Sequence, residues 1–181
     1  MKTAVYSLLA LLATIAFVSC DSDDEPVNNP SDINPPRASE FQTKAGDRIW
    51  TPSTQETAVW VTTDGQTLTA DDLEPVFGGG IESYYFNGSE AVQFILQPGY
   101  PCQVGYNFNY DEESGAITFT HKDKSSISFT LTVESLSEDR MVVRDMDLRE
   151  SAKGEIAYRR VVLVPVDKAE EQKWWDTYIK V

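Results

Sequence analysis

His121 is the first residue to consider for chemistry, because the 181-residue chain contains one histidine. It follows Thr120 at the expected end of a strand, and Asp123 lies two residues further on, so the two side chains could ligate a metal ion. A zinc site usually draws on several histidines and cysteines, and the domain offers only His121 and Cys102. A Ser-His-Asp triad would also need His121, and no serine sits in a nucleophile elbow. The sequence therefore favours a solvated histidine at a strand end, with no metal.

Cys102 and the paired acids are the other reactive groups. Cys102 follows Pro101 with no base close in sequence, which favours a packed small side chain over a nucleophile. Pairs such as Glu112-Glu113 and Glu170-Glu171 carry little information in a chain with 29 acids. Two distant acids could still meet as a glycosidase pair, and the acids of loop 111–114 could bind calcium weakly, but no spacing selects either site. The sequence thus predicts neither an enzyme nor a cofactor.

The chain is strongly acidic. Lys+Arg number 15 against 29 Asp+Glu, which gives a formal net charge of -14. Such a surface repels nucleic-acid phosphates and anionic lipid, so nucleic-acid partners are excluded and membrane binding would need a separate anchor.

The elements that position these residues are short strands between residues 81 and 165. The segment 127–133 shows the pattern most clearly, because its odd positions are apolar and its even positions carry hydroxyls. A period of two puts one set on each face of a pleated strand, with one face buried. Asn87-Gly88 between two such segments predicts a hairpin. Seven strands are expected in this region, at residues 81–86, 91–97, 103–110, 117–119, 127–133, 141–143 and 156–165.

Two further strands are expected around Trp50 and Trp60. The short loops require antiparallel neighbours, and a meander of about eight strands closes into a barrel. The predicted fold is therefore an all-β, antiparallel up-and-down barrel. A barrel of this size either fills with side chains or holds one small ligand.

Two helices are expected beside the barrel. Thr69 can cap a short helix through Phe77 before the main sheet, and Asp167 can start a C-terminal helix. The second helix carries an apolar face that should pack on the outside of the barrel or across one mouth, and the alternative is an aromatic cage for a ligand. This face consists of Trp174, Trp175, Tyr178 and Ile179.

The N-terminus resembles a bacterial lipoprotein signal peptide. Lys2 precedes an apolar run too short to span and remain, and Ser19 precedes Cys20, where acyl chains such as palmitate would be attached. Several acyl chains on Cys20 would anchor the protein firmly to a membrane. The acids after Cys20 resemble the export signal of surface lipoproteins of the Bacteroidota, which implies a lipid anchor on the cell surface of the outer membrane. In enterobacterial sorting, an aspartate at the position of Asp21 would instead imply the inner membrane.

Three segments follow from this interpretation. Residues 1–19 are the signal peptide, residues 20–45 an acidic disordered tether that begins at the lipidated cysteine, and residues 46–181 the barrel domain. The tether is assigned from its Asp, Asn, Pro and Ser content, which leaves almost nothing apolar to bury.

With this signal and tether, the meander ending in a helix resembles the lipocalin-like domains of Bacteroidota surface lipoproteins. Tyr84-Tyr85-Phe86-Asn87-Gly88 before a strand contributes to the likeness, which covers about residues 47–181. The Gly-x-Trp signature of true lipocalins is missing, since Gly46 lies four residues before Trp50. The resemblance implies binding of a small apolar molecule or a role in an envelope assembly.

The leading hypothesis is a non-enzymatic envelope lipoprotein whose barrel binds a small apolar or amphipathic molecule. The expected pocket is lined by inward aromatic side chains, namely Phe94, Tyr106, Phe108, Phe119 and Phe129. The alternative is a structural or interaction subunit of an outer-membrane complex, with a filled barrel and an envelope protein as its partner.

Overall fold

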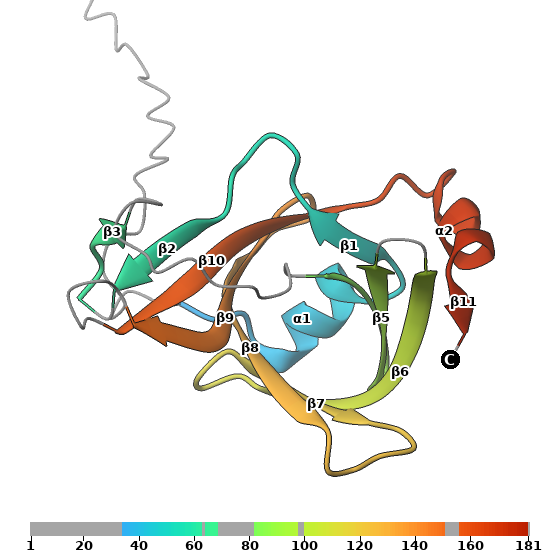
Figure 1. Cartoon of the computed structure of the whole chain (residues 1–181), viewed down its shortest axis with the longest axis horizontal. Helices are drawn as coiled ribbons and strands as arrows, with labels where there is room; N and C mark the ends of the chain where they lie inside the picture. The colour runs from blue at the N-terminus through green and yellow to red at the C-terminus, as the bar shows by residue number, and fades with distance from the viewer. Residues whose placement is uncertain (1–33, 63, 69–81, 98–99, 151–155, 181) are drawn as a thin grey trace, which may run out of the picture.

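The computed structural model describes residues 34–62, 64–68, 82–97, 100–150 and 156–180. Its centre is a closed antiparallel barrel (Figure 1). Eight strands follow one another around it, and β1 closes the ring by pairing with both β4 and β10. The strands are β1 (Ile49–Pro52), β4 (Ser83–Asn87), β5 (Glu90–Gln97), β6 (Tyr100–Asp111), β7 (Ala116–His121), β8 (Ser128–Leu136), β9 (Met141–Glu150) and β10 (Ile156–Pro165). The predicted up-and-down barrel is thus confirmed.

The hairpin predicted at Asn87-Gly88 is present, shifted by one residue. Asn87 pairs with Glu90, so the turn residues are Gly88 and Ser89. Gly88 has a φ of 59°, a left-handed conformation that glycine adopts without a steric penalty. Short turns of this kind make each strand the antiparallel neighbour of the next.

The first barrel strand is interrupted. Both β1 and β2 (Val59–Thr62) run antiparallel to β10, with Pro52 opposite Leu163 and Val59 opposite Arg160. Seven steps along this part of the chain therefore match three steps along β10, and the extra residues form the loop between β1 and β2. Strand β3 (Thr67–Leu68) then pairs with β2 outside the ring.

Helix α1 (Ala38–Ala45) lies across one end of the barrel (Figure 1). Phe41 and Ala45 are 1% and 0% exposed and belong to the barrel core. The Gln42 amide donates to the carbonyl of Gly88 in the β4–β5 turn. The backbone N–H of Ala38 donates to Glu112 in the β6–β7 turn. We call this the α1 end of the barrel, and the end that carries the β7–β8 loop the far end.

Helix α1 corrects the predicted limits of the tether. Disorder was expected through Ala45, because little in residues 20–45 is apolar, yet the last eight of these residues are helical. Phe41 and Ala45 provide the apolar face that this helix buries against the barrel core. The predicted short helix before the sheet is therefore present, but as α1. The helix expected from Thr69 to Phe77 lies outside the described residues.

The barrel core is dominated by aromatic and β-branched side chains, as the alternating pattern predicts. Its innermost residues come from α1 and from all eight strands of the ring. They are Phe41, Ala45, Trp50, Tyr84, Phe86, Ala91, Cys102, Val104, Tyr106, Phe108, Ile117, Phe119, Leu131, Val133, Met141, Val143, Val161 and Leu163.

Helix α2 (Glu171–Thr177) packs on the outside of the barrel (Figure 1). Trp175 contacts Tyr85 of β4, and the Gln103 amide of β6 donates to the carbonyl of Tyr178. Strand β11 (Ile179–Lys180) then pairs in parallel with the part of β6 around Cys102, beyond the end of β7. This arrangement confirms the predicted C-terminal helix and its place on the outside of the barrel, although the helix begins at Glu171 and not after Asp167, and Ile179 is exposed in β11. Of the helices that the structure describes, neither is long and apolar enough to cross a membrane.

Candidate functional site

Four of the five side chains predicted to line a pocket meet inside the barrel. Phe119 and Phe129 stack with ring centroids 4.6 Å apart at 11°. Tyr106 meets the Phe129 ring edge-on at 5.3 Å, and Phe108 lies 6.4 Å from Phe119. These four residues therefore form one aromatic wall across β6, β7 and β8.

Phe94 does not belong to this wall, so its predicted inward orientation is wrong. Its ring lies under α2, 5.7 Å from Trp174, 4.9 Å from Trp175 and 5.3 Å from Tyr178. The inward face of β5 is instead the one that carries Ala91, which belongs to the core. The outer face of β5 carries Phe94 because α2 covers it, while the inward face carries Gln93 beside Ala91, so alternation alone does not tell which face is inside.

The interior next to α1 is filled. Phe41 meets Phe86 at 5.3 Å and Phe108 at 6.1 Å, both edge-on, and it stacks on Tyr110 at 4.5 Å. Such centroid separations are those of rings in direct contact. A ligand that reached the aromatic wall would therefore have to lie on its far-end side.

Polar side chains stand on that side, and His121 is the best defined of them. It pairs with Tyr106 across β6 and β7, and the two rings meet edge-on at 5.6 Å. Its Nδ1 accepts hydrogen bonds from the backbone N–H groups of Asp123 and Lys124, at 3.0 and 3.2 Å. Because Nδ1 accepts from the backbone, the ring N–H that remains for another partner is on Nε2. His121 thus presents an Nε2–H donor beside Tyr106.

The hydroxyl of Tyr106 is a second donor. Tyr106 is 5% exposed, and within the described part of the chain its hydroxyl makes no hydrogen bond. Burial raises the pKa of this phenol, and the nearby Cys102 thiol adds to the effect, so it stays protonated. On the neighbouring inner wall, the Gln93 amide donates to the hydroxyl of Tyr84 at 3.4 Å. The interior therefore changes from apolar at α1 to polar toward the far end.

Sequence reasoning missed His121 and Gln93 as lining residues, although a signal was present. His121 is two residues after Phe119, and Gln93 is two residues after Ala91, so each shares the inward face of its strand. The prediction considered only aromatic side chains on those faces. A test of every inward position, polar ones included, would have found them.

The structure also shows the surroundings of the residues considered for metal binding and thiol chemistry. Asp123 approaches His121 through its backbone N–H and not through its carboxylate. No group of three His, Cys, Asp or Glu that could hold a metal ion occurs among the described residues. Cys102 is a free thiol, 7% exposed, and packs in the core. Cys20 and the predicted signal peptide lie outside the described residues.

The acidic pairs serve the architecture. Glu112 receives the first N–H of α1, as described above. Glu171 is 6% exposed, accepts the backbone N–H of Ile49 at 3.4 Å, and pairs with Lys168 at 2.7 Å. Glu112 and Glu171 thus hold the two helices to the barrel, and its contacts with Ile49 and Lys168 explain why the Glu171 carboxylate is buried.

A charged cluster lies on the outer wall of β8, β9 and β10. Glu134 is the extra residue of a β-bulge in β8, and its carboxylate binds Arg144 at 3.0 Å and Arg160 at 2.5 Å. The Arg144 guanidinium also lies over the ring of Tyr158, 4.1 Å from its centroid. Burial raises the pKa of Tyr158, although Arg144 opposes the change. The cluster links three strands on the outside of the barrel.

Comparison with protein-family models gave no match, and comparison with curated proteins gave none either. Two solved structures of bovine odorant binding protein match part of this chain. A deswapped triple mutant matches at 11% identity and a TM-score of 0.36, over 74% of this chain and 83% of that chain. A complex with a selenium-containing odorant matches at 11% identity and a TM-score of 0.37, over 75% and 83%.

Proposed function

We propose that the barrel binds a small amphipathic molecule at the far-end side of its aromatic wall. The apolar part of the ligand contacts Phe129, which is only partly buried, and an acceptor group such as a carbonyl or carboxylate receives hydrogen bonds from His121 and Tyr106. The observation that carries the proposal is the pairing of two donors, His121 Nε2–H and the Tyr106 hydroxyl, on the inner wall next to the aromatic rings, neither of which has a hydrogen-bond partner among the described residues. Unpaired donors beside apolar surface are the usual composition of a small-molecule site.

The lipid anchor belongs to the same proposal. Cys20, acylated after removal of residues 1–19, would hold the protein at the outer membrane, where it would act as a non-enzymatic envelope lipoprotein. An amphipathic molecule with an acyl or ring-shaped apolar part is a natural ligand at that location, because such molecules partition into membranes.

A calorimetric titration tests the ligand. A long-chain fatty acid, the corresponding alcohol and the corresponding alkane serve as probes that share one chain and differ in the head group. The fatty acid should bind most tightly, because its carboxylate accepts hydrogen bonds from both donors. The alcohol accepts more weakly through its hydroxyl, and the alkane offers no acceptor. His121→Phe and Tyr106→Phe should each weaken fatty-acid binding about two- to tenfold, the range for one hydrogen bond of ~0.5–1.5 kcal/mol. Alkane binding should not change.

Thr118→Ala is the matched control, because Thr118 lies on β7 with its side chain exposed on the outer face. It should leave all three affinities unchanged. Equal affinity for the three probes would contradict head-group recognition. Absence of binding by every probe would overturn the proposal as a whole.

The second candidate is a structural subunit with a filled barrel. The close ring contacts of Phe41, Phe86 and Phe108 favour it, because they leave no room next to α1. A tagged full chain recovered from membranes with one stoichiometric protein partner, together with no probe binding, would support this function instead.

A further inference from the structure

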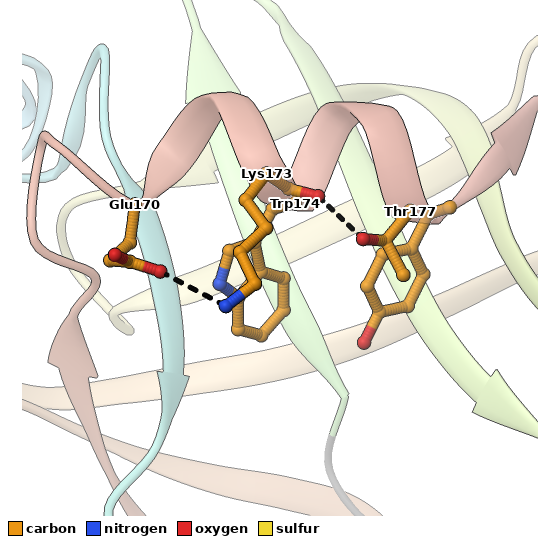
Figure 2. A pocket seen from close by; sticks show the side chains of 5 residues that line it. Glu170, Lys173, Trp174 and Thr177 are labelled. Carbon is orange, nitrogen blue, oxygen red and sulfur yellow. Dashed lines mark hydrogen bonds and ion pairs between the residues drawn. The ribbon is translucent and has the colours of Figure 1, made fainter.

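A pocket of about 170 Å³ lies beside α2, on the outside of the barrel and away from the proposed ligand site in its interior. It is lined by Glu170, Lys173, Trp174, Thr177 and Tyr178 (Figure 2). The geometry points to this pocket as a binding site for a single neutral sugar ring, such as one residue of a glycan.

Two aromatic rings make the floor. Trp174 and Tyr178 are nearly parallel, at 6°, with centroids 5.4 Å apart. This separation is too large for direct face-to-face contact, so the rings are offset-stacked along the helix, and each leaves part of its face uncovered. Phe94 supports both of them edge-on, at 84° to Trp174 and 80° to Tyr178. The support comes from the barrel, so the platform is fixed before any ligand arrives.

The rim offers both donors and acceptors. Glu170 and Lys173 form an exposed pair at 3.4 Å, which supplies carboxylate oxygens and an ammonium group with little net charge. The Thr177 hydroxyl donates to the carbonyl of Lys173 and keeps its lone pairs for another donor. Among the described contacts, the Trp174 indole N–H and the Tyr178 hydroxyl have no hydrogen-bond partner. Sugar hydroxyls both donate and accept, so this mixture suits them.

The same features argue against other occupants. A quaternary ammonium group needs rings that enclose it, and these rings are parallel with Lys173 close by. An acyl chain or a drug-sized ligand needs a larger cavity, since such pockets hold about 300–1,000 Å³. A proline-rich peptide would stack on the rings, but its prolines have no N–H group to donate to the rim acceptors of Glu170 and Thr177. A sugar ring suits both parts of the pocket. Its C–H face packs on the electron-rich aromatic rings, and its hydroxyls form hydrogen bonds with the donors and acceptors of the rim.

Titration of the isotope-labelled full chain by NMR tests the site, with methyl glycosides of glucose, galactose, mannose and N-acetylglucosamine as probes. At least one should shift the indole N–H signal of Trp174, with a dissociation constant of about 1–10 mM, as expected of a small open site. Trp174→Leu should weaken that binding at least tenfold. Thr177→Trp, which fills the pocket from an exposed position and leaves the packing on Phe94 intact, should also abolish it.

Gln172→Ala is the matched control. Gln172 is an exposed residue of α2 outside the pocket. The variant protein should therefore bind each glycoside as tightly as the unaltered chain does. No shift with any glycoside, or binding that survives Thr177→Trp, would overturn the proposal. Binding of a proline-rich peptide or of neutral lipid vesicles at this pocket, without glycoside binding, would overturn it in favour of a protein or a membrane partner. Whether fatty acids bind inside the barrel does not affect this test, because the two sites are separate.

Discussion

The indole N–H of Trp50 donates to the carbonyl of Ala45 at 3.0 Å, and both residues are 0% exposed. This hydrogen bond joins the first strand of the barrel to the last residue of α1. The carbonyl is one of the acceptors that a helix leaves unpaired at its C-terminal end. Trp50 therefore satisfies a buried group of the helix that closes the barrel.

Trp50→Phe should destabilise the fold by about 1–3 kcal/mol, the cost of leaving a buried acceptor without a partner, with a further small cost for lost packing. Urea unfolding followed by circular dichroism measures it. Trp175→Phe is the matched control, because Trp175 has no hydrogen bond from its indole N–H among the described residues. An equal loss in both variants would show that ring size matters and the hydrogen bond does not.

Much of the fold could be predicted because the information is local. Period-two alternation and turn chemistry located the seven ring strands β4 to β10, and the ring closes as their number suggested, whereas the short strand β11 was not predicted. The inward placement of Phe119 and Phe129 followed from the same alternation. Ile127 marks its limit: it continues the apolar series of β8 but is 45% exposed, because it precedes the strand.

The errors have a common physical cause, since they depend on contacts between distant segments. Phe94 is outside the core because α2 comes to cover it, and nothing near Phe94 in the sequence announces that cover. Helix α1 forms in a polar segment because the barrel provides a site for Phe41. Propensity and pattern describe a segment alone, and tertiary packing decides these two cases.

Glu134 gives the second prediction for stability. It sits between Arg144 and Arg160 with 7% of its side chain exposed, while the arginines are 15% and 19% exposed. Glu134→Gln removes the negative charge and leaves two adjacent guanidinium groups in a poorly solvated place. The expected loss is about 3 kcal/mol, near the lower end for breaking a buried pair, because glutamine still offers one acceptor.

A double variant and a matched control separate charge from packing. Glu134→Gln with Arg144→Met should cost less than Glu134→Gln alone, because it removes one of the uncompensated charges. Glu56→Gln breaks an exposed pair with Arg140, in which the side chains are 44% and 45% exposed, and should cost at most about 1 kcal/mol. Chemical denaturation of the four proteins checks the order. A double variant less stable than the single one would contradict the role given to charge.

Tyr110 predicts how stability depends on alkaline pH. Its hydroxyl donates to the carbonyl of Pro36 at 2.6 Å, next to α1. Burial first, and then the nearby Glu112, Asp111 and Glu40 carboxylates, raise the pKa of Tyr110 from 10.0 to about 12. Between pH 10 and 12 the unfolded chain therefore releases this proton while the folded chain keeps it. The contribution to stability is fully present below pH 10 and falls as the pH rises to 12.

Tyr110→Phe isolates this contribution. Near pH 8 the variant should be less stable than the unaltered chain by about 1 kcal/mol, because it lacks the hydrogen bond to Pro36. Between pH 10 and 12 the difference should shrink, since only the unaltered chain pays for keeping that proton. Burial also raises the pKa of Tyr106, Tyr158 and Tyr178, so both proteins should still lose stability over this range. Urea midpoints at pH 8, 10 and 11.5 measure the difference, and a constant difference at all three would show that Tyr110 is not responsible for it.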